Sequence, residues 1–123
     1  MKGILITPDN AVNVLTLEEP FYKGFQKAVG GYFEIVRPIS LPGPYRMVIN
    51  EEGKINGLPF NMIASYLYGS HIYGDPVVGN LLILKEGFVD GEPDLVGLED
   101  DEIDKLISLF SQITNTFERS FFK

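Results

Sequence analysis

The chain contains no cysteine and no tryptophan, and it has a single histidine. The lack of cysteine excludes disulfides, thiolate zinc sites and a cysteine nucleophile, and it is common in proteins of a reducing cytosol. No apolar run approaches the ~20 residues of a bilayer-spanning helix, and the first apolar run is too short for a signal peptide. We therefore expect a cytoplasmic protein that is not inserted in a membrane.

Positive charge is also scarce. Ten Lys and Arg stand against seventeen Asp and Glu, which gives a formal net charge of −7. Such a surface repels a phosphate backbone, so direct nucleic-acid binding is disfavoured. An acidic surface can instead imitate nucleic acid and occupy a basic protein site, although acidity more often serves solubility alone.

The length of 123 residues and the apolar fraction of 45% predict one domain, residues 1–123, with one hydrophobic core. No internal repeat or low-complexity tract is present. The apolar run at residues 3–7, a Pro-Asp-Asn turn and the alternation at residues 12–17 predict a β-hairpin. Aromatic and apolar residues at helical spacing predict a helix over 21–29, which ends at Gly30-Gly31.

Further elements follow along the chain. Residues 32–36 and 45–49 have strand composition, and residues 77–84 predict a buried strand at the centre of the sheet, entered through a bulge or turn at Gly79 and Asn80. Residues 55–58 are expected to pair briefly beside a hairpin tip at 51–54, and residues 87–97 to form a loop with a few extended residues. A short helix starts near Asn61, whose side chain suits an N-cap.

The clearest element is a long C-terminal amphipathic helix. Its apolar stripe recurs at offsets of three and four: Ile103, Leu106, Ile107, Phe110, Ile113, Phe117 and Phe121. The acidic run 99–102 complements the positive end of the helix dipole, with Arg119 and Lys123 near the other end. Phe117, Phe121 and Phe122 also favour a homodimer through this helix. The predicted fold class is α+β, with the helices packed on a mainly antiparallel sheet.

The stretch from Val48 to Ser65 looks specified by more than packing. It gathers polar side chains on one loop, the kind of segment that often carries recognition: Asn50, Glu51, Glu52, Lys54, Asn56 and Asn61. A turn glycine and the N-cap explain part of it structurally. We interpret these six residues as candidates for ligand or partner binding.

An aromatic cluster follows, formed by Tyr66, Tyr68, His71 and Tyr73. Tyrosines combine flat apolar faces with a polar end, so they serve both packing and recognition. Packing is the commoner role of such residues, but the cluster is a second set of binding candidates, and a border with the loop at 50–61 would favour a ligand pocket or a partner interface. His71 has no nucleophile-elbow serine and no second imidazole beside it, so a catalytic or metal role has little support.

Known chemical motifs do not emerge elsewhere. Gly30-Gly31 follows a helix rather than preceding one, so it is no phosphate loop. The acidic group at Asp90-Gly91-Glu92 lacks the ligand spacing of a calcium loop. We therefore assign no catalytic residue, no metal site and no cofactor.

Four segments, in order along the chain, carry a family resemblance: VGGYFEIV at 29–36, VINEEGKINGLPFN at 48–61, GNLLILKEG at 79–87 and LEDDEIDKLISLF at 98–110. Together they resemble a family of small phage and conjugative-element proteins, domain-of-unknown-function family 3846. Phe60 stands where a second proline is expected and Met62 where a basic residue is expected, which weakens the transfer of a charged contact at position 62. The resemblance implies a mobile-element setting in a bacterial host and brings no activity or cofactor with it.

Three hypotheses follow. The first is a non-enzymatic accessory or host-interaction protein that binds an unknown host protein or small ligand through the loop at 50–61 and its aromatic neighbours. The second is an acidic DNA mimic that inhibits a nucleic-acid-binding host protein. The third is a small enzyme or sequestering protein for a nucleotide-derived ligand, using Asp75, His71 or the pair Glu51 and Glu52.

Overall fold

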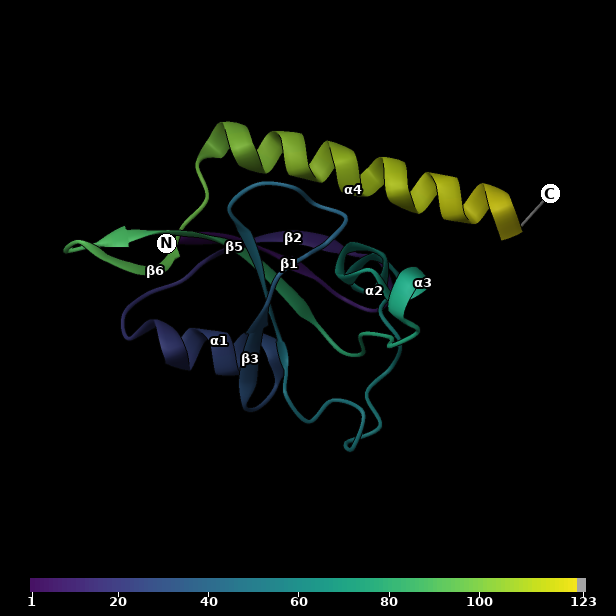
Figure 1. The fold of residues 1–123 in the computed structure, drawn as a ribbon, viewed down its shortest axis with the longest axis horizontal. Helices are drawn as coiled ribbons and strands as arrows, with labels where there is room; N and C mark the ends of the chain where they lie inside the picture. The colour runs from purple at the N-terminus through teal and green to yellow at the C-terminus, as the bar shows by residue number, and fades with distance from the viewer. Residues whose placement is uncertain (122–123) are drawn as a thin grey trace.

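The computed structural model describes residues 1–121, except for the side chains of Tyr73 and residues 119–121. These residues form an α+β fold, in which one antiparallel sheet carries helices on both faces (Figure 1). The elements are, in order, β1 (Lys2–Ile6), β2 (Val12–Thr16), α1 (Phe21–Val29), β3 (Phe33–Val36), β4 (Tyr45–Asn50), α2 (Met62–Tyr68), α3 (Ser70–Tyr73), β5 (Leu81–Val89), β6 (Glu92–Val96) and α4 (Asp100–Phe121). The predicted fold class is confirmed.

Within the described chain the sheet has six strands, in the order β2-β1-β5-β4-β3, and β6 also pairs with β5. The central strand β5 therefore pairs with three strands, β1, β4 and β6. Its first residues pair with β1, Ile83 opposite Ile4, and its later residues pair with β6, Lys85 opposite Val96. Its other side pairs with β4, Ile83 opposite Met47. The expectation of a central strand in this part of the chain is confirmed.

The two faces of the sheet bury separate apolar clusters because successive side chains of a strand point to opposite faces. In Figure 1, α4 lies above the sheet and α1 lies below it, while α2 and α3 lie at the right-hand end of the sheet beneath the C-terminal part of α4. The buried residues of the upper cluster come from three strands, two helices and the loops between them, and include Ile4, Met47, Ile83, Ile63, Leu67, Leu106 and Phe110. The lower cluster packs α1 on the sheet: Leu17, Phe25, Ala28, Val29, Val48, Leu82 and Leu84.

The long helix α4 follows its predicted stripe. Ile103, Leu106, Phe110 and Ile113 are buried on the upper face of the sheet. Its first turn is acidic, and the Glu102 carboxylate accepts the backbone N–H of Glu99 at 3.0 Å, the back-reaching half of a capping box. The predictions for the side chains of Arg119 and Phe121, and for Phe122 and Lys123, lie outside the described residues.

A cluster of half-buried polar side chains connects the start of α4 to the sheet. The Lys85 ammonium lies 2.5 Å from one oxygen of Glu102, and the Tyr45 hydroxyl donates to the other at 3.2 Å. The hydrogen bond from Lys85, followed by that from the Glu99 N–H, lowers the pKa of Glu102. The same contact raises the pKa of Lys85, while burial and then the charge of Glu102 raise the pKa of Tyr45.

Three sequence predictions are wrong. The loop expected at 87–97 is a hairpin, because β5 continues to Val89 and β6 pairs back along it after a turn at Asp90 and Gly91. Residues 77–80 precede β5 rather than belonging to it. No hairpin tip forms at 51–54, since β4 leads through a series of turns to α2; Phe60 rather than residues 55–58 pairs there, in an isolated bridge with Val78.

Replacing Glu102 with Gln is expected to lower the free energy of unfolding at pH 7 by about 2 kcal/mol, because Lys85 loses a charged hydrogen-bond partner. A carboxylate with a lowered pKa in the folded state contributes stability above its unfolded pKa, ~4.3, and loses it as the pH falls through the folded pKa. The difference between the two proteins should therefore persist to about pH 4.5 and shrink below it. Urea denaturation across pH 2.5–7 measures this difference in the free energy of unfolding.

The control is Asp104→Asn, at an exposed carboxylate of the same helix, and it should change the stability little. An equal effect of both variants would contradict the role assigned to Glu102.

Candidate ligand-binding site

The polar loop at 50–61 begins with a buried amide. Asn50 at the end of β4 is 7% exposed, and its side-chain NH₂ donates to the Val29 carbonyl at 3.0 Å. Its side-chain oxygen accepts the Glu52 N–H at 2.8 Å. Asn50 thus joins the end of α1 to the first turn of the loop, and it holds Glu51 and Glu52 in position on the surface.

Asn61 lies at the end of the loop, and its side chain is buried in the core. Its side chain is fully buried, and its oxygen accepts the Ala64 N–H at 3.0 Å, which confirms the predicted N-cap of α2. Its NH₂ donates to the carbonyls of Ile6 at 3.1 Å and Gly79 at 2.9 Å. Every polar atom of this side chain is used within the chain, so Asn61 supports the site without forming part of its surface.

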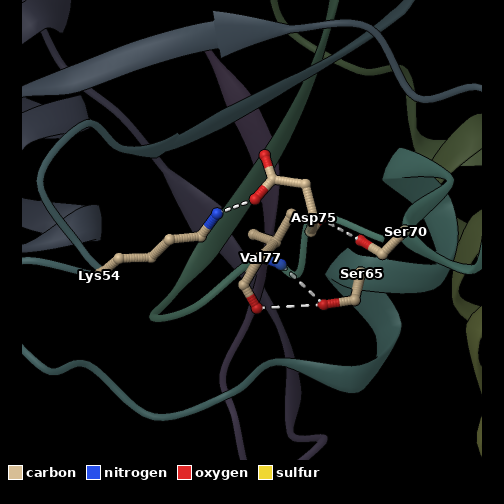
Figure 2. A network of polar contacts seen from close by, with 5 residues as sticks. All are labelled: Lys54, Ser65, Ser70, Asp75 and Val77. Carbon is tan, nitrogen blue, oxygen red and sulfur yellow. Dashed lines mark hydrogen bonds and ion pairs between the residues drawn. The ribbon is translucent and has the colours of Figure 1, made fainter. Parts of the chain in front are cut away.

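A second segment, residues 75–78, faces this loop and is held by serines. The Ser65 hydroxyl accepts the Val77 N–H at 2.9 Å and donates to the Val77 carbonyl at 3.1 Å, while Ser70 donates to the Asp75 carbonyl at 2.6 Å. Figure 2 shows these contacts, with Lys54 reaching across from the loop to form an ion pair with the Asp75 carboxylate. The two segments are thereby joined at the surface.

Between them lies an open pocket of about 290 Å³, called here the loop pocket. Its lining comes from β3, β4, the loop, α2 and the facing segment: Glu34, Ile49, Asn50, Glu51, Glu52, Gly53, Lys54, Ile55, Tyr68, Asp75, Pro76, Val77 and Val78. Four carboxylates and one ammonium line it. Gly53 is packed against Val78, and a Cβ at position 53 would lie 2.9 Å from that side chain. Only glycine therefore lets the two walls approach this closely.

The predicted binding residues divide between two places. Asn50, Glu51, Glu52, Lys54 and Tyr68 line the loop pocket. Asn56 is exposed and does not line it, whereas Asn61 is buried beneath. The side chain of Tyr73 lies outside the described residues.

Tyr66 and His71 line a different, shallower groove. Their rings are stacked with centroids 5.2 Å apart, and Tyr66 also meets Phe117 of α4 edge to face at 5.6 Å. The groove holds about 210 Å³ and is lined by these three residues with Phe60, Met62, Ser65 and Ser70. Among the described side chains of the aromatic cluster, Tyr68 alone borders the loop pocket.

The chemistry available at the loop pocket is ionic and hydrogen-bonding. In the described part of the chain, no group of three or more His, Cys, Asp or Glu residues is placed to hold a metal ion. The described residues that line the groove containing His71 include no carboxylate. None of the helices formed by the described residues combines the length and apolarity that a bilayer crossing requires.

Sequence reasoning missed Glu34 as a pocket residue. It lies on β3 opposite Ile49, and its side chain lines the loop pocket from the sheet. A charge in the middle of a short apolar strand was the signal, because such a residue must face solvent, a partner or a cavity. Asp75 was singled out only for the enzyme hypothesis, and here it pairs with Lys54.

Comparison with known proteins gives one family. A family model described as a domain of unknown function, DUF3846, matches residues 1–111, which confirms the resemblance seen in the sequence motifs. No curated protein and no solved structure matches the chain. The matched range includes every residue that lines the loop pocket.

Replacing Asn61 with Ala is expected to lower the free energy of unfolding by roughly 3 kcal/mol, because it removes an N-cap and leaves the carbonyls of Ile6 and Gly79 without this donor. Chemical denaturation measures the loss. Asn56→Ala, at an exposed position of the same loop, is the matched control and should change stability by less than about 0.5 kcal/mol. Equal stability of the two variants would contradict the structural role of Asn61.

Replacing Ser65 with Ala should cost about 2 kcal/mol, because the buried Val77 N–H loses its acceptor. The amide of Val77 should also exchange with solvent faster in the variant, as measured by NMR hydrogen exchange. Ser108→Ala on the exposed side of α4 provides the comparison, with no such change at Val77. Unchanged exchange at Val77 in Ser65→Ala would show that another contact holds this wall.

Proposed function

The chain belongs to the DUF3846 family, and from this premise we propose that it is a non-enzymatic binding protein of a phage or mobile element that acts on a host protein through the loop pocket. The motifs that resemble phage and conjugative-element proteins support the proposed setting, and the geometry of the loop pocket supports the proposed binding role. One observation carries the proposal: two segments separated by α2 and α3 are held from beneath by buried polar side chains and meet around an open, charged pocket.

This construction is typical of a recognition site. Asn50, Asn61 and Ser65 are buried and hydrogen-bonded, so the backbone beneath the pocket is well defined. Glu51 and Glu52, by contrast, are exposed at the rim, as is Ile55, which is 87% exposed. A rigid base with an exposed and chemically mixed rim offers preformed contacts to a partner at little cost in ordering.

The size of the pocket favours a protein partner over a metabolite. Its volume of about 290 Å³ lies just below the range for small-molecule sites, ~300–1,000 Å³, and it is open to solvent. Such a pocket can hold one side chain of a larger partner, whose remaining contacts lie around the rim.

The competing hypotheses receive less support. His71 stacks on Tyr66 in the aromatic groove, while Asp75 pairs with Lys54 at the loop pocket, so the structure does not join the two as an acid-base pair. A DNA mimic needs free carboxylates in a regular array. At the start of α4, however, Asp100 pairs with Lys2 and Glu102 pairs with Lys85.

The test uses the full chain carrying Glu51→Lys and Glu52→Lys together, compared with wild type in native mass spectrometry after incubation with fractions of a bacterial host lysate. A matched control carries Glu92→Lys and Asp104→Lys, which change the net charge equally at exposed positions outside the loop pocket. We expect a host protein that stays bound to wild type and to the control. The variant with both substitutions in the loop pocket should retain at least about tenfold less of this host protein than wild type does.

Two outcomes would overturn the proposal. One is a partner that is retained equally by all three proteins, since its contact would then lie elsewhere. The other is a wild-type protein that retains no protein from any fraction or retains a nucleotide-derived compound instead. Circular dichroism of each variant before the experiment ensures that only folded proteins are compared.

A further inference from the structure

We propose that the open edge of β3 accepts an extended segment of the partner protein as an added strand, with a Lys or Arg of that segment opposite Glu34. This proposal rests on the proposed function, because Glu34 belongs to the loop pocket. It names what enters the pocket: the basic side chain of a strand. Strand addition of this kind obtains affinity from main-chain hydrogen bonds and specificity from pockets for alternate side chains.

The first observation is an unpaired sheet edge. In the sheet order, β3 is the terminal strand, and only β4 pairs with it in the described chain. The Tyr32 carbonyl accepts the Glu51 N–H at 2.9 Å, and Tyr32 and Glu51 continue the register in which Phe33 lies opposite Asn50. Residues of an antiparallel strand alternate in the direction of their N–H and C=O groups. Those of Tyr32 and Glu34 therefore face β4, whereas those of Phe33 and Ile35 face outward.

The second observation is the position of Glu34 on that edge. It lies opposite Ile49, a residue of the upper cluster, so its side chain is on the face that carries α2 and the loop pocket. Ile35 lies opposite Val48 of the lower cluster, and it is 48% exposed on the other face. The edge thus offers a carboxylate on one face and an uncovered apolar side chain on the other.

These two observations together determine the register of an added antiparallel strand. It would exchange hydrogen bonds with Phe33 and Ile35, so its residue opposite Glu34 occupies a non-hydrogen-bonded pair, where side chains approach most closely. That residue projects on the same face as Glu34, toward the loop pocket. Its flanking residues project on the face of Ile35.

The charge of the pocket selects the residue opposite Glu34. Four carboxylates, Glu34, Glu51, Glu52 and Asp75, stand against the single ammonium of Lys54, an excess of three negative charges. A Lys or Arg there meets complementary potential, whereas an acidic residue meets repulsion and an apolar residue leaves Glu34 unpaired. A second copy of the chain is disfavoured in the register centred on this residue, because it places the two Glu34 carboxylates opposite each other. The expected segment alternates apolar and basic residues.

The probe is a fluorescein-labelled, end-blocked peptide, Thr-Val-Arg-Val-Thr, whose binding to the full chain is followed by fluorescence anisotropy at low salt. The matched peptide has Glu in place of Arg and should bind about tenfold more weakly. Two further peptides test strand addition. N-methylation of both valine amides blocks the bonds to β3 and should abolish binding, while N-methylation of the arginine amide, which points away from β3, should be tolerated.

Variants of the edge complete the test. Glu34→Lys should reverse the preference between the Arg and Glu peptides, whereas Glu92→Lys, with the same charge change on an exposed residue of β6, should retain it. Ile35→Pro removes an outward N–H that no strand of the described chain uses, so the monomer should stay folded while peptide binding is lost. A melting curve checks folding, and Glu34→Lys keeps the test decisive if the proline variant unfolds.

The outcomes separate this inference from the proposed function. Equal binding of the Arg and Glu peptides, or an unchanged preference in Glu34→Lys, would overturn the inference. A wild-type dimer that Ile35→Pro converts to a monomer would also overturn it, because the edge would then pair with a second copy. If the lysate partner depends on Glu51 and Glu52 and is indifferent to Glu34→Lys and Ile35→Pro, the proposed function stands and strand addition fails.

Discussion

The buried amide of Asn61 is the interaction on which the arrangement most depends. Through one side chain it caps α2, binds the end of β1 at Ile6 and binds the chain just before β5 at Gly79. These three segments are distant in sequence, and no apolar side chain could join them, since each presents an unpaired backbone group that must be satisfied. The upper layer of the fold and the floor beneath the loop pocket are therefore positioned by the same residue.

The alternation of side chains along β3 and β4 determines which residues reach the surface at the loop pocket. Because β3 and β4 are in register, Phe33 joins the lower cluster while Glu34 faces the pocket on the upper side. A shift of one residue would bury the carboxylate against α1 and expose the phenylalanine. The electrostatic character of the pocket thus follows from the same pairing that builds the core, and the loop contributes the remaining charges.

The parts of the fold with strong local signals could be predicted from sequence. The stripe of α4 and the cap at Asn61 needed only residues a few positions apart. The burial of Asn50 could not be predicted, because its partner Val29 lies on another element and an asparagine in a loop reads equally well as surface. β6 was missed because Gly91 and Pro93 suggested a loop, although the turn at Asp90 and Gly91 returns the chain along β5. Glu34 entered the site only once the sheet order was known.

The sharing of β5 by β1, β4 and β6 also constrains how the molecule assembles. The β1-β2 and β3-β4 hairpins are local and can form from the first fifty residues, but nothing in that stretch joins them into one sheet. Ile6 pairs with Leu81 and Ile49 pairs with the same residue from the other side, so both contacts close long loops. During synthesis, the two hairpins can join into one sheet only after residues 81–89 have been made. Closure of these distant pairings is the step expected to limit the folding rate.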